Sequence, residues 1–238
     1  MNEAPSLASP KGTIVVSYGM PKSASSFAWM LIKKIAQEGG LDVRDLSANA
    51  KGNKSAEDYL TDANEDRQRI IKDEVGDGTV VIKTHAGPKA FPNIEKHYEK
   101  AIIFAQHRDP REIALSLIDH AARSRRLGIS DFAECTNVEN CRPVIISAID
   151  NFISWCKIPK TCAISYNELC FELEKTIPII SQSLNVTVDT EEIINHFKDK
   201  SKIIQFNKGQ KDRWKNEMTE DDENFILEYC KEYYNYFK

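Results

Sequence analysis

Residues 13–27 read TIVVSYGMPKSASSF, in which an apolar run gives way to a short segment of Gly, Pro, Lys and Ser. The β-branched run Thr13–Tyr18 predicts a buried strand, and apolar residues at helical spacing from Ser25 to Gly39-Gly40 predict a helix. The intervening segment therefore leads into the first turn of a helix, where backbone N–H groups are unpaired. These donors and the helix dipole attract phosphate, although an ordinary serine-capped helix with a solvated Lys22 would show the same residues.

Short apolar runs that alternate with helical stretches recur along the chain and decide the fold class. Three further buried strands are predicted at Thr79–Lys83, Ile102–Gln106 and Cys162–Ser165, and Leu41–Leu46 is a weaker strand candidate. Helices are expected at Ala56–Val75, Pro110–Arg126 and Val144–Cys156, loops at 123–141 and 207–216, and mostly helix in the remainder. Strands and helices in alternation imply a parallel sheet covered on both faces, so the expected fold is α/β with three αβα layers.

The length and the amino-acid composition of the chain are those of a globular protein. Its 238 residues are 41% hydrophobic, which suits one domain over 12–238 after a disordered tail at 1–11. The formal net charge of −4 provides no basic field for nucleic acid, and no apolar run has the length of a membrane span. Six cysteines without metal-site spacing, and a start without a secretory signal, favour reduced thiols in the cytoplasm. The oligomeric state stays open between monomer and homodimer.

Polar clusters follow four of the expected strands, at the edge where ligands bind in parallel sheets. They are the segment after Tyr18, Lys83 with His85, Arg108, and Tyr166. Histidine can accept a proton near neutral pH, and arginine offers a forked set of donors that suits a phosphate. Each cluster taken alone also fits a structural role, such as a hydrogen-bonded histidine or a capped helix. Their coincidence at one edge favours a ligand site.

Five segments resemble motifs of the cytosolic sulfotransferases. MPKSASSF (20–27) resembles the 5′-phosphosulfate loop PKSGTTW, VVIKTHAGP (80–88) contains the KTH element, and HRDPREIALS (107–116) resembles RDPRDVAVS. CAISYNEL (162–169) resembles YEDL, and FNKGQKDRWKNEMT (206–219) resembles RKGxxGDWKN. The resemblance extends over essentially the whole chain after the tail, and it implies a P-loop NTPase-like sulfotransferase fold.

The resemblance also implies a cofactor and roles for named residues. The co-substrate would be 3′-phosphoadenosine 5′-phosphosulfate (PAPS), the product adenosine 3′,5′-bisphosphate (PAP), and no metal is expected. The expected catalytic residues are His85 as base, Lys22 at the leaving oxygen, and Lys83 as a second cation. The residues expected to bind the cofactor are Lys22, Ser23, Ala24, Ser25, Ser26, Phe27, Arg108, Ser116, Tyr166, Asn207, Lys208 and Gly209.

Besides Asp212 and Arg213, which replace Gly-Asp, three departures from the family motifs concern residues expected to bind the cofactor. Ala24 replaces a glycine, Phe27 replaces a tryptophan that stacks on adenine, and Asn207 replaces an arginine at the 3′-phosphate. Alanine fits if the backbone at residue 24 avoids positive φ, and phenylalanine keeps a smaller stacking face. The loss of the cation at residue 207 could be compensated by Arg213.

Two other interpretations stay open. A P-loop kinase of small molecules would also place Lys22-Ser23 after a strand, but the glycine spacing of that motif and an acidic magnesium partner are not evident. A catalytically reduced, nucleotide-binding protein with the same fold would fit the three departures, although Lys22 and His85 are both retained. The expected acceptor is a small molecule with a hydroxyl or an amine. Residues 123–143 align with no motif and lie where acceptor-binding loops are expected.

Overall fold

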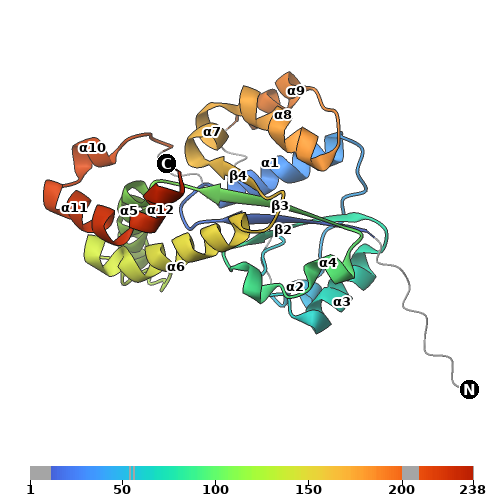
Figure 1. Cartoon of the computed structure of the whole chain (residues 1–238), viewed down its shortest axis with the longest axis horizontal. Helices are drawn as coiled ribbons and strands as arrows, with labels where there is room; N and C mark the ends of the chain where they lie inside the picture. Colours follow the sequence, from blue (N-terminus) through green and yellow to red (C-terminus); the bar gives the residue numbers. More distant parts are fainter. Residues whose placement is uncertain (1–11, 54, 56, 200–208, 238) are drawn as a thin grey trace, which may run out of the picture.

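The computed structural model describes residues 12–53, 55, 57–199 and 209–237. Its centre is a sheet of four parallel strands in the order β2-β1-β3-β4. The strands are β1 Thr13–Gly19, β2 Thr79–Thr84, β3 Lys100–His107 and β4 Cys162–Ser165, so each of the four main strand predictions is confirmed to within two residues. Helices cover both faces of the sheet, which confirms the predicted αβα fold class (Figure 1).

Side chains of β1 alternate between two hydrophobic cores, one on each face of the sheet. Ile14, Val16 and Tyr18 pack into one core, whereas Val15 packs into the other. β1 lies between β2 and β3, and its residues after Thr13 are buried. A strand that is buried on both faces needs apolar residues at nearly every position, which explains the continuous apolar run in the sequence.

Two groups of helices complete the cores. The core that contains Val15 is covered by α1 Ser25–Glu38, α7 Tyr166–Phe171, α8 Leu173–Leu184 and α9 Thr190–Phe197. The other core is covered by α3 Glu65–Val75, α4 Ile94–His97, α5 Pro110–Leu127, α6 Val138–Cys156, α11 Glu220–Tyr229 and α12 Lys231–Tyr236. The short elements are α2 Ala48–Lys51, η1 Pro88–Ala90 and α10 Trp214–Glu217. Within the ranges described, none of these helices combines the length and apolar content that crossing a bilayer requires.

The segment between α1 and α3 differs from the prediction. Leu41–Leu46 is not a strand, since only Val43 forms an isolated bridge, to Thr79. The helix predicted at Ala56–Val75 begins only at Glu65, where the Asn64 side chain caps it, and Tyr59 forms a bridge to Lys83 instead. Both bridges lie on the outer edge of β2. Irregular chain that pairs with an edge strand at single points protects that edge without adding a strand.

The second difference concerns helix boundaries near residues 123–141, which were predicted to form a loop. α5 continues to Leu127 and ends at Gly128, which adopts a left-handed conformation with φ of 68°. α6 begins at Val138, where the Asn137 side chain accepts a hydrogen bond from the Asn140 N–H. The loop is therefore only 128–137. Near the C-terminus, Trp214 starts the helical turn α10 inside the predicted loop 207–216.

Candidate functional site

A cavity of about 630 Å³ lies where the segments that follow the four strands meet. Parallel pairing aligns Tyr18 with Thr84 and Ala105, and His107 with Ser165, so the strands end at a common edge. The lining includes most residues that the sequence predicted for the site, namely Lys22, Ala24, Ser25, Ser26, Phe27, Lys83, His85, Arg108, Ser116, Tyr166 and Gly209. The predicted residues Asn207 and Lys208 lie outside the described residues.

The β1–α1 loop, residues 20–24, is a tight turn at the start of α1. The fully buried Ser23 donates its hydroxyl to the Met20 carbonyl at 2.7 Å, and its N–H bonds to the same oxygen at 3.2 Å. Ser23 is not among the residues that line the cavity, and its predicted role in binding the cofactor stays a prediction. Its side chain shapes the loop, whereas Ser25 and Ser26 in the first turn of α1 line the cavity.

The backbone of this loop is left-handed at two positions, Lys22 with φ of 66° and Ala24 with φ of 62°. The condition on which alanine was expected to fit at residue 24 is therefore not met. An L-residue with a Cβ atom in this region costs roughly 1–2 kcal/mol, because Cβ crowds the following carbonyl oxygen. The first turn of α1 is thus held in place at the expense of local strain at Ala24.

Replacing Ala24 by glycine should relieve this strain. We expect Ala24→Gly to stabilise the protein by about 1 kcal/mol, which for a chain of this size raises Tm by about 2–4 °C. Ala36→Gly provides the control, because Ala36 lies in the interior of the same helix, where glycine is unfavourable. Thermal unfolding followed by circular dichroism measures both. A lower Tm for Ala24→Gly would contradict the assignment of strain.

Lys22 extends from the loop to His120 on α5, with 3.1 Å between Nζ and Nδ1 of the imidazole. The pKa of Lys22 is lowered to about 8, mainly by burial and also by the positive charges of Arg123 and Arg108, against an opposing effect of Asp119. The ammonium is therefore still protonated near pH 7. Cations that destabilise one another across a cavity are stabilised together by an anionic ligand.

His85 follows β2 and lines the cavity. Its Nδ1 lies 2.6 Å from the carbonyl oxygen of Gly19, and a carbonyl only accepts, so Nδ1 carries the proton. In the neutral ring, Nε2 is then the unprotonated nitrogen. Burial lowers the pKa of His85 to about 4, and the hydrogen bond to Gly19 opposes the effect of burial. The imidazole is thus neutral at pH 7 and has one nitrogen free to accept a proton.

Lys83 is buried between two oxygen acceptors. Its ammonium donates to Ser26 Oγ and to Glu57 Oε2, both at 2.7 Å. Burial lowers the pKa of Lys83, and the hydrogen bond and charge of Glu57 oppose that shift. The positive charge of this lysine is balanced by the negative charge of Glu57. Glu57 Oε1 is buried and has no hydrogen-bond partner among the described residues.

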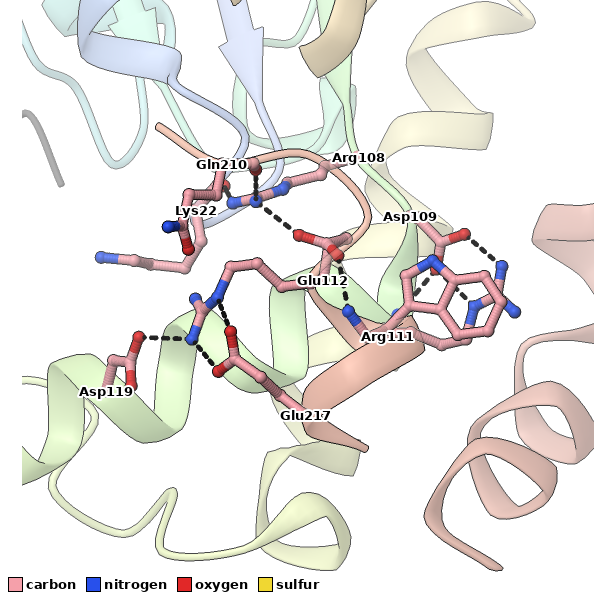
Figure 2. Close-up of polar contacts among 10 residues, drawn as sticks. Lys22, Arg108, Asp109, Arg111, Glu112, Asp119, Gln210 and Glu217 are labelled. Atoms are coloured by element: carbon pink, nitrogen blue, oxygen red, sulfur yellow. Dashed lines mark hydrogen bonds and ion pairs between the residues drawn. The ribbon is translucent and has the colours of Figure 1, made fainter. Parts of the chain in front are cut away.

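Arg108 connects the β1–α1 loop with the C-terminal segment, as Figure 2 shows. Its guanidinium donates to the Lys22 carbonyl at 3.1 Å, to the Gln210 carbonyl at 3.3 Å and to the Glu112 carboxylate at 2.7 Å. The other oxygen of Glu112 accepts the Trp214 N–H at 3.0 Å. Arg108 is 7% exposed, and its buried Nε has no partner in the part of the chain that the structure describes. A phosphate fits here, because it offers an acceptor to a donor that otherwise lacks one.

Arg213, the residue that could compensate for the cation absent at residue 207, is already paired with carboxylates. It lines the cavity, but its guanidinium donates to both oxygens of Glu217 at 2.9 and 2.7 Å. It also forms an ion pair with Asp119 at 2.9 Å (Figure 2). With two carboxylates around one guanidinium, this group adds no net positive charge to the cavity. The prediction that Arg213 compensates is therefore not supported by its contacts.

The two aromatic residues predicted at the site both line the cavity, and both contact neighbours. Phe27 packs edge-on against Phe197 with 5.3 Å between ring centroids. Tyr166 carries the guanidinium of Arg108 over its ring, 3.8 Å from the centroid. One face of Tyr166 is thus covered by a cation, and the ring also makes an edge contact with Phe171, with 6.0 Å between centroids.

Comparisons with known proteins agree on the fold. No family model and no curated protein matches the sequence. The solved structure of mouse sulfotransferase SULT7A1 complexed with PAP is 16% identical, with a TM-score of 0.64 over 94% of this chain and 85% of that chain. Retinol dehydratase in complex with androsterone and the inactive cofactor PAP is also 16% identical, with a TM-score of 0.61 over 94% and 81% of the two chains. This chain has the sulfotransferase fold.

A third structure with the sulfotransferase fold covers nearly the same span. The sulfotransferase domain from the Synechococcus PCC 7002 olefin synthase is 13% identical, with a TM-score of 0.51 over 96% of this chain and 98% of that chain. The agreement in length and topology confirms the expectation of this fold, which the motifs raised.

Within the sulfotransferase fold, several residues that line the cavity were missed by the sequence analysis. They include Glu57, Tyr59, His120, Asp131, Phe132, Phe171, Leu173 and Phe197. Asp131 and Phe132 come from the loop 128–137, inside the segment that aligned with no motif. Only their position in that segment could have indicated them, because charged and aromatic residues in loops are common. Glu57 and His120 gain their significance from partners far away in the sequence.

Proposed function

We propose that this protein is a sulfotransferase that moves a sulfuryl group from PAPS to a hydroxyl or an amine of a small molecule. The observation that carries the proposal is the meeting of three groups at one cavity. These are the first turn of α1, the cations Lys22 and Arg108, of which Arg108 is paired with Glu112, and the unprotonated Nε2 of His85. Anion binding at a helix N-terminus and a base at the same cavity suit transfer of an anionic group.

Two subsites would bind the phosphates of the co-substrate. The backbone N–H groups in the first turn of α1, with the hydroxyls of Ser25 and Ser26, suit the 5′-phosphate. The 3′-phosphate suits a second subsite, which consists of Arg108 with its unpartnered Nε, Ser116 and Gly209. Ser116 lies eight residues after Arg108, on α5. Phe27 and Tyr166 offer aromatic surface to the adenine. When bound, PAPS supplies a sulfuryl group attached to a phosphate oxygen that leaves readily.

In the proposed reaction, His85 Nε2 accepts the proton of the acceptor hydroxyl as that oxygen bonds to sulfur. The bond from sulfur to the bridging phosphate oxygen breaks at the same time, and the ammonium of Lys22 stabilises the charge that grows on that oxygen. Stabilising charge where it develops is usually the largest catalytic contribution, and one such donor is worth roughly 3 kcal/mol. Glu57 compensates Lys83, so Lys83 mainly holds Ser26 and Glu57 in place.

A thermal-shift assay with PAP, followed by an acceptor screen with labelled PAPS, tests the proposal. PAP at 100 times its dissociation constant should stabilise the protein by about 2.7 kcal/mol, which raises Tm by roughly 5–10 °C. Transfer should persist in EDTA. Absence of any PAP effect would contradict the assignment, and phosphoryl transfer from ATP that requires magnesium would favour the kinase alternative.

Arg108 provides the second prediction. We expect Arg108→Lys to weaken PAP binding by about 10- to 100-fold, because hydrogen bonds to a charged partner contribute about 1.5–3 kcal/mol and lysine lacks the fork. Isothermal titration calorimetry with PAP measures the change. Arg69→Lys is the control, since Arg69 is exposed on α3 and pairs with Asp66. Unchanged PAP affinity in Arg108→Lys would remove Arg108 from the phosphate subsite.

A further inference from the structure

His120 is a residue for which neither the motifs nor the proposed reaction provides a role. It lies on α5, one helical turn after Ser116, and both residues line the cavity. Residues four apart on a helix share a face, so the helix that presents Ser116 to the proposed phosphate subsite also presents His120. The ring of Phe132 contacts the imidazole edge-on, with 5.7 Å between centroids.

The contacts of His120 determine which of its nitrogens carries the proton. Lys22 Nζ lies 3.1 Å and an Arg123 guanidinium nitrogen lies 3.0 Å from the same atom, Nδ1. Ammonium and guanidinium groups are donors only, so Nδ1 must be the acceptor and the proton of the neutral ring must be on Nε2. The imidazole thus accepts from two cations at once.

The charges around His120 favour this neutral form. Lys22 acts on the ring from the β1–α1 loop, Arg123 from α5, and Asp131 from the loop 128–137. Burial lowers the pKa of His120, and Lys22 and Arg123 lower it further, whereas Asp131 opposes them. Protonation of Nδ1 would remove the acceptor and place a third positive charge beside two others. The contact with Lys22 therefore depends on a neutral imidazole.

We propose that His120 is a positioning residue that fixes the ammonium of Lys22 at the cavity wall through Nδ1. This inference rests on the proposed sulfotransferase function, in which Lys22 meets the leaving oxygen. A lysine side chain has four rotatable bonds, and fixing it beside the reacting atoms costs conformational entropy. A hydrogen bond to His120 restricts the side chain before the substrate binds, so less of this entropy is lost during the reaction. His120 would then raise turnover without contributing to binding of the nucleotide.

The first test is spectroscopic and requires no substrate. In the full chain with ¹⁵N-labelled histidine, His120→Asn assigns the His120 signals among those of the five histidines. We expect His120 to be in the Nε2–H tautomer. In Lys22→Met, the titration midpoint of His120 should be at least half a pH unit higher than in the wild type, because the positive charge of Lys22 is absent. The Nδ1–H tautomer, or a midpoint unchanged by Lys22→Met, would overturn the proposal.

The second test measures turnover, as PAP released from PAPS in the absence of an acceptor, where water accepts the sulfuryl group. We expect His120→Leu to lower this rate at least 10-fold while PAP affinity stays within about 2-fold. His120→Asn should recover most of the rate, because its side-chain oxygen can accept from Lys22 where Nδ1 does. A rate that rises in His120→Leu, or falls equally in both variants, would overturn the positioning role.

The two tests separate this inference from the function on which it rests. If the tautomer and the shift with Lys22→Met are observed but PAP does not bind, the sulfotransferase proposal fails and the turnover role fails with it. If PAP binds and turnover is measured but the His120 variants behave like the wild type, only the positioning role fails.

Discussion

His85→Asn is expected to lower kcat by about 10³-fold while the affinity for PAP stays within about 2-fold of the wild type. The asparagine amide can still donate to the Gly19 carbonyl, so the local structure is retained, but the base at Nε2 is lost. General base catalysis contributes typically 10²- to 10⁴-fold. Steady-state kinetics with labelled PAPS and calorimetry with PAP measure the two quantities. His196→Asn serves as control, because His196 is exposed on α9.

The pH dependence provides a sharper form of this test. The base must be unprotonated, so activity falls as pH decreases through the pKa of His85, which burial lowers to about 4. The acid limb of kcat/KM for PAPS reports the ligand-free enzyme and should therefore lie well below 6.5, the ordinary value for histidine. An acid limb at 6.5 or above, or full activity of His85→Asn, would assign the proton transfer to another group.

The second large effect is expected for Lys22→Met, which should lower kcat by about 10²- to 10³-fold and weaken PAP binding by no more than about 5-fold. Methionine keeps most of the side-chain stem but removes the ammonium that stabilises the leaving oxygen, a contribution of about 3–4 kcal/mol. The ratio of the two effects is the critical quantity, because a lysine that only attracted the nucleotide would change affinity and turnover alike.

Lys34→Met is the matched control, since Lys34 lies on α1 and pairs with Glu38 at the surface. The ammonium must be protonated to act, so activity of the ligand-free enzyme should fall as pH rises through about 8. Lys22→Met should lack this alkaline limb. A variant whose kcat is unchanged would contradict the role of Lys22 at the leaving group.

The sequence predicts the site well where function follows from topology. Strands of β-branched residues are recognisable, and in a parallel sheet their carboxyl ends share an edge, so Lys22, His85 and Arg108 were expected together and all line the cavity. The resemblance supplied the roles of these residues. The edge segment at Leu41–Leu46 was only a weaker strand candidate, and in the structure its pairing is limited to one bridge, between Val43 and Thr79.

Other features could not be predicted, because they depend on partners or backbone angles that the sequence does not reveal. Nothing in the loop SYGMPKSASS distinguishes the inward hydroxyl of Ser23 from those of its neighbours, or predicts positive φ at Ala24. Glu57 and His120 lie in a polar loop and on a helix face, where each looks like an ordinary surface residue. Their importance follows from Lys83 and Lys22, which the fold brings to them.

Glu112 accepts hydrogen bonds from Arg108 and from the Trp214 N–H with its two oxygens. The carboxylate of Glu112 thus connects Arg108, in the proposed phosphate subsite, to the first turn of α10. The electrostatic potential at the subsite therefore depends on whether that turn is formed. If opening of this turn changes the affinity of Arg108 for an anion, then binding of the anion must also change the opening equilibrium of the turn. Thermodynamic linkage requires that the two changes in free energy are equal. Amide hydrogen exchange at Trp214 would therefore report occupancy of a subsite that the tryptophan itself does not touch.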